Sequence, residues 1–265
     1  MRVIFNYSKL KQRKKIELIL LFIYFLTIGF VLYKLKLSYM ITGLIYMGIP
    51  SLYLICKLPE FSKKCIVESA VLTIPMVFII DYIGHVSKVW YESSSEIGVR
   101  LFNVIPIETF IWGFIYLYFI IIFYEYFFDR SKVKRFSKNF KKELILFIAL
   151  LFGFLIVLVL NNNLLIINHF YIYLSLGFFL IVFIGFLRYP KLFNKIVLTE
   201  IFLFIPWIIH EIISLESHHW IFTGNNYLGY IQIFQYQFPL EELWWLIIVV
   251  PAVLLWHEYF VDNCK

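Results

Sequence analysis

Residues 106–129 read PIETFIWGFIYLYFIIIFYEYFFD, and residues 239–262 read PLEELWWLIIVVPAVLLWHEYFVD. Both stretches begin with a Pro-x-Glu motif, run through apolar and aromatic residues for about the 20 positions that cross a membrane, and end on an aspartate. Identities at a single offset of 133 include Pro106/Pro239, Glu108/Glu241, Trp112/Trp245, Glu125/Glu258, Tyr126/Tyr259 and Asp129/Asp262. Matches at one offset predict a tandem repeat.

The composition of the whole chain indicates the same membrane environment. Of its 265 residues, 62% are apolar and 15% are charged, whereas soluble domains are roughly 45–50% apolar and about 25% charged. With 30 Phe, 11 Gly and 3 Cys, the chain is not disordered, collagen-like or a disulfide scaffold. These values predict an all-α polytopic membrane protein.

Apolar runs long enough to cross a bilayer predict eight transmembrane helices. Helices are expected because an open sheet in lipid would leave backbone groups unpaired, and the alternation typical of an outer-membrane barrel is absent. The predicted spans are 17–34, 39–56, 66–83, 105–128, 143–160, 168–187, 197–213 and 238–260.

The basic residues predict an orientation. All but four of the 24 Lys and Arg residues precede the first span, lie in alternate connections or follow the last span. The four on the other side are Lys34, Lys36, Lys88 and Arg100. By the positive-inside rule, both termini are expected in the cytoplasm of a multi-pass cell-membrane protein. This distribution also explains the net charge of +7 without a nucleic-acid partner.

The repeat extends upstream of the two Pro-x-Glu helices. Further pairs, with offsets that differ slightly as unequal loops would give, are Pro75/Pro206, Trp90/Trp220, Gly98/Gly229 and Lys14-Lys15/Lys141-Lys142. The chain is therefore expected to contain two four-helix membrane repeats, 1–134 and 135–265. Because four is even, the repeats should be parallel, with a cavity between them.

Acidic residues near the outer ends of the spans are the candidate catalytic groups. Glu108, Glu241 and Glu242 stand at helix entrances, where Pro and Glu also suit the first turn of any helix. A capping role alone does not explain why the motif recurs beside tryptophans, and ionisable groups near hydrocarbon are usually functional. Asp81 and Glu211, five or six residues beyond the paired prolines, are expected to approach these entrances.

Aromatic residues and prolines complete the candidate site. The predicted substrate-binding residues are Trp90, Trp112, Trp220, Trp244, Trp245, Pro106 and Pro239. Tryptophan faces can stabilise a cationic intermediate, although such residues more often form an interfacial belt. The stretch from His210 to His219 is not HExxH, and no nucleotide fingerprint is present, so no metal or cofactor is expected.

The doubled pattern of a loop tryptophan, a glycine and then Pro-x-Glu before an aromatic helix resembles the lycopene cyclase domain family, in its fused form. The family motif corresponds to Pro106 and Glu108 in the first half and to Pro239, Glu241 and Glu242 in the second. The first half has Thr109 where the motif often has a second Glu.

The resemblance implies an isomerase, or intramolecular lyase, that cyclises an acyclic carotenoid end group. A carboxylic acid protonates the terminal alkene, a neighbouring double bond attacks the cation, and a base removes a proton, with no net redox change. A carboxyl group at the edge of the hydrocarbon can hold its proton near neutral pH. Glu241 or Glu108 is expected to be the acid, with Glu242, Asp81 and Glu211 as base or supporting groups.

Other classes of function remain open from the sequence. A related terpene or meroterpenoid cyclase would use the same chemistry on another prenyl substrate, and a small parallel-repeat transporter would also place acids at a central site. The expected partners are the lipid bilayer, a lipophilic isoprenoid and other carotenoid-pathway enzymes.

Overall fold

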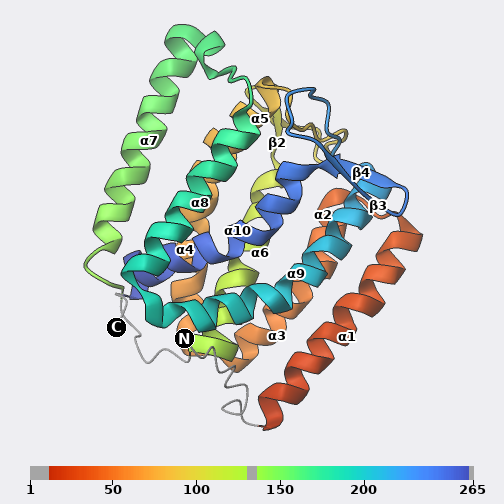
Figure 1. The fold of residues 1–265 in the computed structure, drawn as a ribbon, viewed down its shortest axis with the longest axis vertical. Coiled ribbons are helices and arrows are strands. Elements are labelled where there is room, and N and C mark those ends of the chain that lie inside the picture. The colour runs from red at the N-terminus through yellow and green to blue at the C-terminus, as the bar shows by residue number, and fades with distance from the viewer. Residues whose placement is uncertain (1–11, 130–135, 263–265) are drawn as a thin grey trace.

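The computed structural model describes residues 12–129 and 136–262. Within these residues, eight helices are long and apolar enough to span a membrane, which confirms the predicted all-α polytopic architecture. They pack as a single bundle, with the connecting hairpins gathered at one end (Figure 1).

The first half contributes four spans, two of which are interrupted by π-helical turns. In chain order, its helices are α1 (Gln12–Leu35), α2 (Tyr39–Gly43), η2 (Leu44–Gly48), α3 (Ile49–Lys57), α4 (Pro59–Pro75), η3 (Met76–Asp81), α5 (Tyr82–Val86), α6 (Glu108–Tyr124) and η4 (Glu125–Asp129). The second span comprises α2, η2 and α3, and the third comprises α4, η3 and α5.

The second half contributes the other four spans in the same order. Its helices are α7 (Phe140–Asn161), η5 (Asn162–Leu165), α8 (Phe170–Arg188), η6 (Pro190–Leu192), α9 (Phe193–Glu216), α10 (Leu240–His257) and η7 (Glu258–Asp262). Both halves therefore end on a long helix that closes with a π-helical turn.

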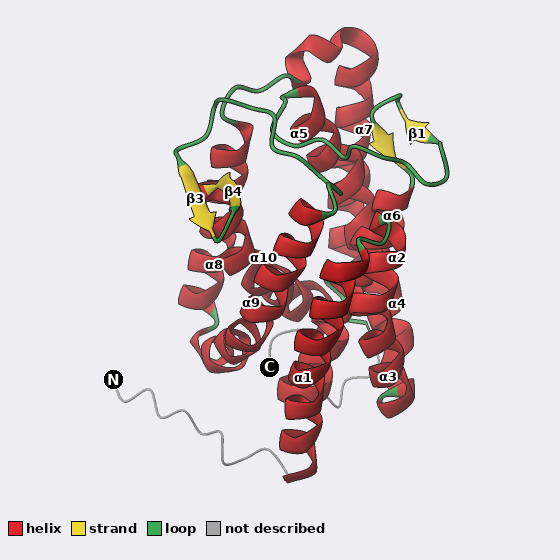
Figure 2. Cartoon of the chain, turned by 90° about the vertical axis from the view of Figure 1, so that its right-hand side faces the viewer, coloured by secondary structure: helices red, strands yellow, loops and turns green. Residues whose placement is uncertain are grey.

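Each of these final helices is preceded by a β-hairpin that the hydropathy pattern did not predict. β1 (Arg100–Leu101) pairs antiparallel with β2 (Ile105–Pro106), and β3 (Tyr230–Ile233) pairs antiparallel with β4 (Tyr236–Pro239). Figure 2 shows the strands and long loops at one end of the helices. The backbone pairing satisfies polar groups where the chain leaves the bundle.

The core is built around α6 and α10. Every residue of α6 from Ile115 to Tyr124 is buried, as is every residue of α10 from Ile248 to Leu255. In contrast, α7 leaves apolar residues such as Val159 (82% exposed) on the outside. A helix that is apolar all round is stable with one face in the core and the other in lipid.

One π-helical turn shapes the region of the site. Asp81 lies six positions after Pro75, whereas Glu211 lies five positions after Pro206. The first half carries η3 at Met76–Asp81, where the second half continues as the regular helix α9. A π-helical turn accommodates one inserted residue and is frequent at functional sites. The span then continues as α5, with Asp81 at the last position of the π-helical turn.

Candidate functional site

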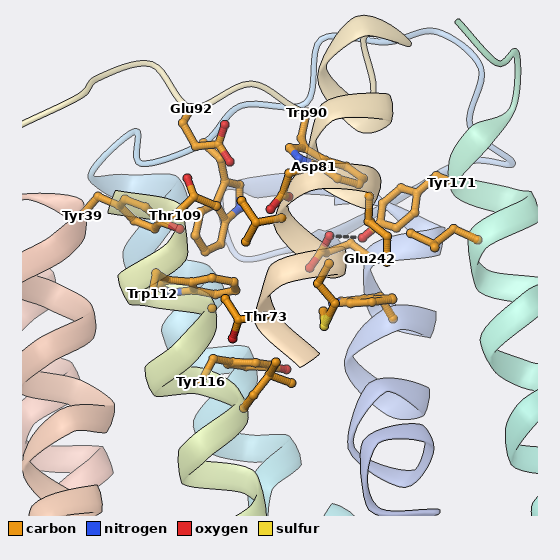
Figure 3. Close-up of a pocket in the computed structure, with 18 of the residues that line it drawn as sticks. Tyr39, Thr73, Asp81, Trp90, Glu92, Thr109, Trp112, Tyr116, Tyr171 and Glu242 are labelled. Atoms are coloured by element: carbon orange, nitrogen blue, oxygen red, sulfur yellow. Dashed lines mark hydrogen bonds between the residues drawn. The ribbon is translucent and has the colours of Figure 1, made fainter. Parts of the chain in front are cut away.

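A cavity of about 110 Å³ lies at the hairpin end of the bundle, and both halves contribute to its walls. Its acidic and hydroxyl-bearing residues are Tyr39, Thr73, Asp81, Glu92, Thr109, Tyr116, Tyr171 and Glu242. Its larger apolar rings are Trp90, Trp112, Trp220, Phe222 and Trp245. Figure 3 shows the carboxyl groups and aromatic rings converging on this space.

Two loops that cross over the cavity are joined to each other. The backbone N–H of Tyr91 donates to the carbonyl of Ile221 at 3.0 Å, and the N–H of Ile221 donates to the carbonyl of Tyr91 at 2.9 Å. The two residues follow Trp90 and Trp220 and share their offset of 130. This bridge places both tryptophans over one cavity.

Of the three glutamates in the two motifs, Glu242 is the one that lines the cavity. It lies in the first turn of α10, is 8% exposed, and its Oε2 accepts a hydrogen bond from the hydroxyl of Tyr171 on α8. The dashed line in Figure 3 marks this bond. Within the described residues, no Lys, Arg or His forms an ion pair with Glu242.

Glu108 and Glu241, the two expected acids, are engaged elsewhere. Oε1 of Glu108 accepts the backbone N–H of Ile97 and a bond from the Ser95 hydroxyl at 3.1 Å. Oε1 of Glu241 accepts the backbone N–H of Leu228 at 2.7 Å. Neither residue lines the cavity. Both carboxylates hold the loop that precedes their hairpin, which is close to the capping role considered from the sequence.

Asp81 and Glu211 each contact a loop tryptophan. Glu211, 3% exposed, accepts a hydrogen bond from Nε1 of Trp220 at 3.1 Å. Asp81 is in side-chain contact with Trp90 and lines the cavity. Glu211 is not part of the cavity wall and lies behind its tryptophan partner. These carboxyl groups therefore orient the rings that cover the cavity.

Four of the five predicted tryptophans belong to the cavity wall. Trp90, Trp112, Trp220 and Trp245 line the cavity, and Trp112 stacks on Tyr116 at 5.1 Å between ring centroids.

The other predicted substrate-binding residues lie outside the cavity wall. Trp244 is 42% exposed and packs against Phe179. Pro106 and Pro239 end the second strand of each hairpin, where they set the entrance to α6 and α10.

Glu92 and His85 were not singled out in the sequence. Glu92, 4% exposed, lines the cavity from the loop after Trp90, and its Oε2 lies against Nε2 of His85. At the offset of 130, the second half has Phe222 and Leu215 in their places. A search for repeated residues misses this pair, because the pair occurs in one half alone.

Among the described residues, one cluster of possible metal ligands lies away from the cavity. In the part of the chain that the structure describes, the group of neighbouring ligand atoms is Glu125, His257 and Asp262, at the opposite end of the bundle, where Lys64 contacts both carboxylates. Near the cavity, Nε2 of His219 bonds the carbonyl of Leu37 at 2.8 Å. Burial lowers the pKa of His219, so the ring is a neutral packing partner of Tyr39.

No family model, curated protein or solved structure matches the chain.

Proposed function

We propose that this protein is a membrane cyclase that protonates the terminal trisubstituted alkene of an acyclic isoprenoid, with a carotenoid such as lycopene as the substrate. The observation that carries the proposal is the position of Glu242, a buried carboxyl group in a cavity walled by tryptophan and tyrosine rings. The resemblance of the doubled Pro-x-Glu motif to the lycopene cyclase domain family supports the same chemistry.

Glu242 is the proton donor in this proposal. An unpaired negative charge is costly in apolar surroundings, and no cationic side chain pairs with Glu242 in the described chain. The Tyr171 hydroxyl bonds one carboxyl oxygen. This bond fixes the orientation of the group and stabilises the carboxylate left after proton transfer.

The aromatic wall suits the cation that follows. The face of an indole or phenol attracts positive charge, most strongly where water is excluded. Trp112 lies 5.9 Å from Trp220 and 5.1 Å from Tyr116, measured between ring centroids. A tertiary cation among these rings would be stabilised and kept from water, so that the neighbouring double bond attacks first.

The cavity is proposed to face the outer leaflet of the cell membrane, with both termini in the cytoplasm. The basic residues of the described connections after α3 and α8, which include Lys63 and Lys191, lie at the end opposite to the hairpins, as the positive-inside rule requires for this orientation. A lipophilic substrate would reach the cavity from the bilayer and needs no aqueous path.

The test is expression in cells that accumulate lycopene, followed by chromatography of the pigments. The wild-type chain is expected to yield cyclic carotenoids, and Glu242→Gln should reduce this activity by at least the roughly 10²- to 10⁴-fold typical of general-acid loss. Glu216→Gln is the matched control, because Glu216 lies at the same end of the bundle but pairs with Lys36 outside the cavity.

A wild-type chain that is inserted and leaves lycopene unchanged would reject this substrate. Conversion of another prenyl chain would then indicate a related terpene or meroterpenoid cyclase.

A further inference from the structure

We propose that Glu92 is the base of the reaction, and that His85 holds its carboxylate at the cavity wall. This inference rests on the proposed cyclase function and divides the chemistry between the two halves. Glu242 of the second half gives the first proton, and Glu92 of the first half accepts the last one.

The position of Glu92 is fixed from two sides. Its carboxylate contacts Nε2 of His85, and the two side chains are 6% and 2% exposed. Its backbone carbonyl accepts a hydrogen bond from Nη2 of Arg100 at 2.8 Å, while Nη1 of Arg100 bonds the carbonyl of Val104, also at 2.8 Å. The loop that carries Glu92 is thereby tied to the first hairpin, and its side chain enters the cavity wall (Figure 3).

His85 is held so that only one nitrogen faces Glu92. Its Nδ1 lies 2.9 Å from the backbone carbonyl of Asp81, which can only accept a hydrogen bond, so Nδ1 carries a proton. Nε2 is then the atom that faces the Glu92 carboxylate, and a proton on it would give that carboxylate a charge partner. A carboxylate beside an imidazole has a partner for its charge, whereas Glu242 has none among the described cations. This difference assigns the base to Glu92 and the acid to Glu242.

The asymmetry of the repeat supports the same division. Where the first half has Glu92 and His85, the second has Phe222 and Leu215; where the second half has Glu242, the first has Thr109. Glu92, Thr109, Phe222 and Glu242 all line the one cavity. Two equivalent sites would each need an acid and a base. Here the proposed acid and the proposed base come from opposite halves and line one cavity, as a single shared site requires.

The proposed step balances without an oxidant or reductant. The O–H bond of Glu242 breaks, and its proton forms a C–H bond on the terminal alkene. The resulting tertiary cation is attacked by the neighbouring double bond, which closes the ring through a new C–C bond. A ring C–H bond then breaks, its electrons form the ring double bond, and the proton goes to Glu92.

Asp81, which interacts electrostatically with Glu92 and lies in the same wall, offers a carboxyl through which a proton can return towards Glu242.

The test compares the rate and the products of wild type and Glu92→Gln with lycopene in detergent. The variant keeps its acid, so it should still form the cation, but it lacks the base. We expect cyclic product to form at least about 10²-fold more slowly, and a larger share of it to carry a displaced double bond or a hydroxyl group from capture by water. Glu92→Asp, which retains a carboxylate, should restore part of the rate and the normal product.

The control is Glu96→Gln in the same loop, since Glu96 is exposed and bonds the backbone N–H of Met40 at 2.6 Å. If Glu92→Gln does not insert, His85→Leu makes the test, because leucine stands at this position in the second half. That variant should show the same product shift and a lower kcat at similar KM. Wild-type rate and products in either folded variant would overturn the inference. A wild type that converts neither lycopene nor another prenyl chain would instead reject the proposed function.

Discussion

Lys64 in α4 forms a buried ion pair with Asp262 in η7, and so joins the third span of the first half to the last span of the second. Its Nζ also lies 3.3 Å from Oε1 of Glu125, which in turn lies 3.0 Å from Nε2 of His257. All four side chains are at most 5% exposed. The opposite end of the bundle from the cavity is therefore held by charges from both halves.

Loss of the Lys64 ammonium should destabilise the protein strongly. Lys64→Met leaves Glu125 and Asp262 buried without their lysine partner, and breaking one side of a buried pair typically costs about 3–5 kcal/mol. The measurement is the thermal unfolding midpoint of the purified protein in detergent. Lys63→Met, one position earlier and exposed, is the control and should leave the midpoint nearly unchanged. Equal midpoints for the two variants would contradict a structural role for the cluster.

Removal of the Tyr171 hydroxyl should slow cyclisation without unfolding the site. In Tyr171→Phe the ring remains beside Trp90, but the hydrogen bond to Glu242 is lost. If the bond contributes about 1.5 kcal/mol to the charged state of the acid, the rate should fall by about tenfold. The comparison is made with Tyr173→Phe, whose side chain is 59% exposed on the same helix. A rate for Tyr171→Phe that matches this control would mean that the bond does not assist proton transfer.

The first glutamate of each Pro-x-Glu motif is expected to matter for stability more than for turnover. Glu108→Gln and Glu241→Gln keep an oxygen that can accept the loop N–H of Ile97 or Leu228, so activity should stay within a few fold of wild type. Glu108→Ala and Glu241→Ala leave these donors unpaired and should lower stability by about 1–3 kcal/mol. A well-folded Glu108→Gln or Glu241→Gln variant without activity would return these residues to the role of acid.

Gly84 lets Trp90 reach the cavity. A Cβ atom at Gly84 would lie 2.3 Å from a ring carbon of Trp90, which is too close for any contact. Gly84→Ala should therefore lower the unfolding midpoint and the activity, and Gly84→Ala combined with Trp90→Phe should recover the midpoint but not the activity. Gly177→Ala is the control, because a Cβ there meets nothing within 4 Å. Unchanged activity in Gly84→Ala would show that the position of Trp90 is not needed.

The helices were predictable from the sequence because hydropathy is local, and the eight apolar runs correspond to the eight candidate spans. Which glutamate enters the cavity was not predictable from spacing. Glu241 and Glu242 differ by about 100° around α10, and their directions are decided by the loop N–H of Leu228 and the hydroxyl of Tyr171. Leu228 lies in the loop before the hairpin and Tyr171 on another span, so helix spacing alone reveals neither contact. Glu92 was not predictable from the repeat, because it has no counterpart in the second half, where Phe222 stands.

The orientation of the site in the membrane can be tested by cysteine labelling. The basic connections predict that the hairpin end faces outward, so that the cavity opens at the outer leaflet. In a chain with Cys56 and Cys264 replaced by serine, buried Cys65 stays unreactive, and Ser94→Cys or Lys63→Cys introduces one exposed thiol at either end of the bundle. In intact cells, a membrane-impermeant maleimide should label Ser94→Cys, whereas Lys63→Cys should react only after permeabilisation. The reverse pattern would place Glu242 and Glu92 at the cytoplasmic leaflet, and the substrate would then have to be supplied from that side.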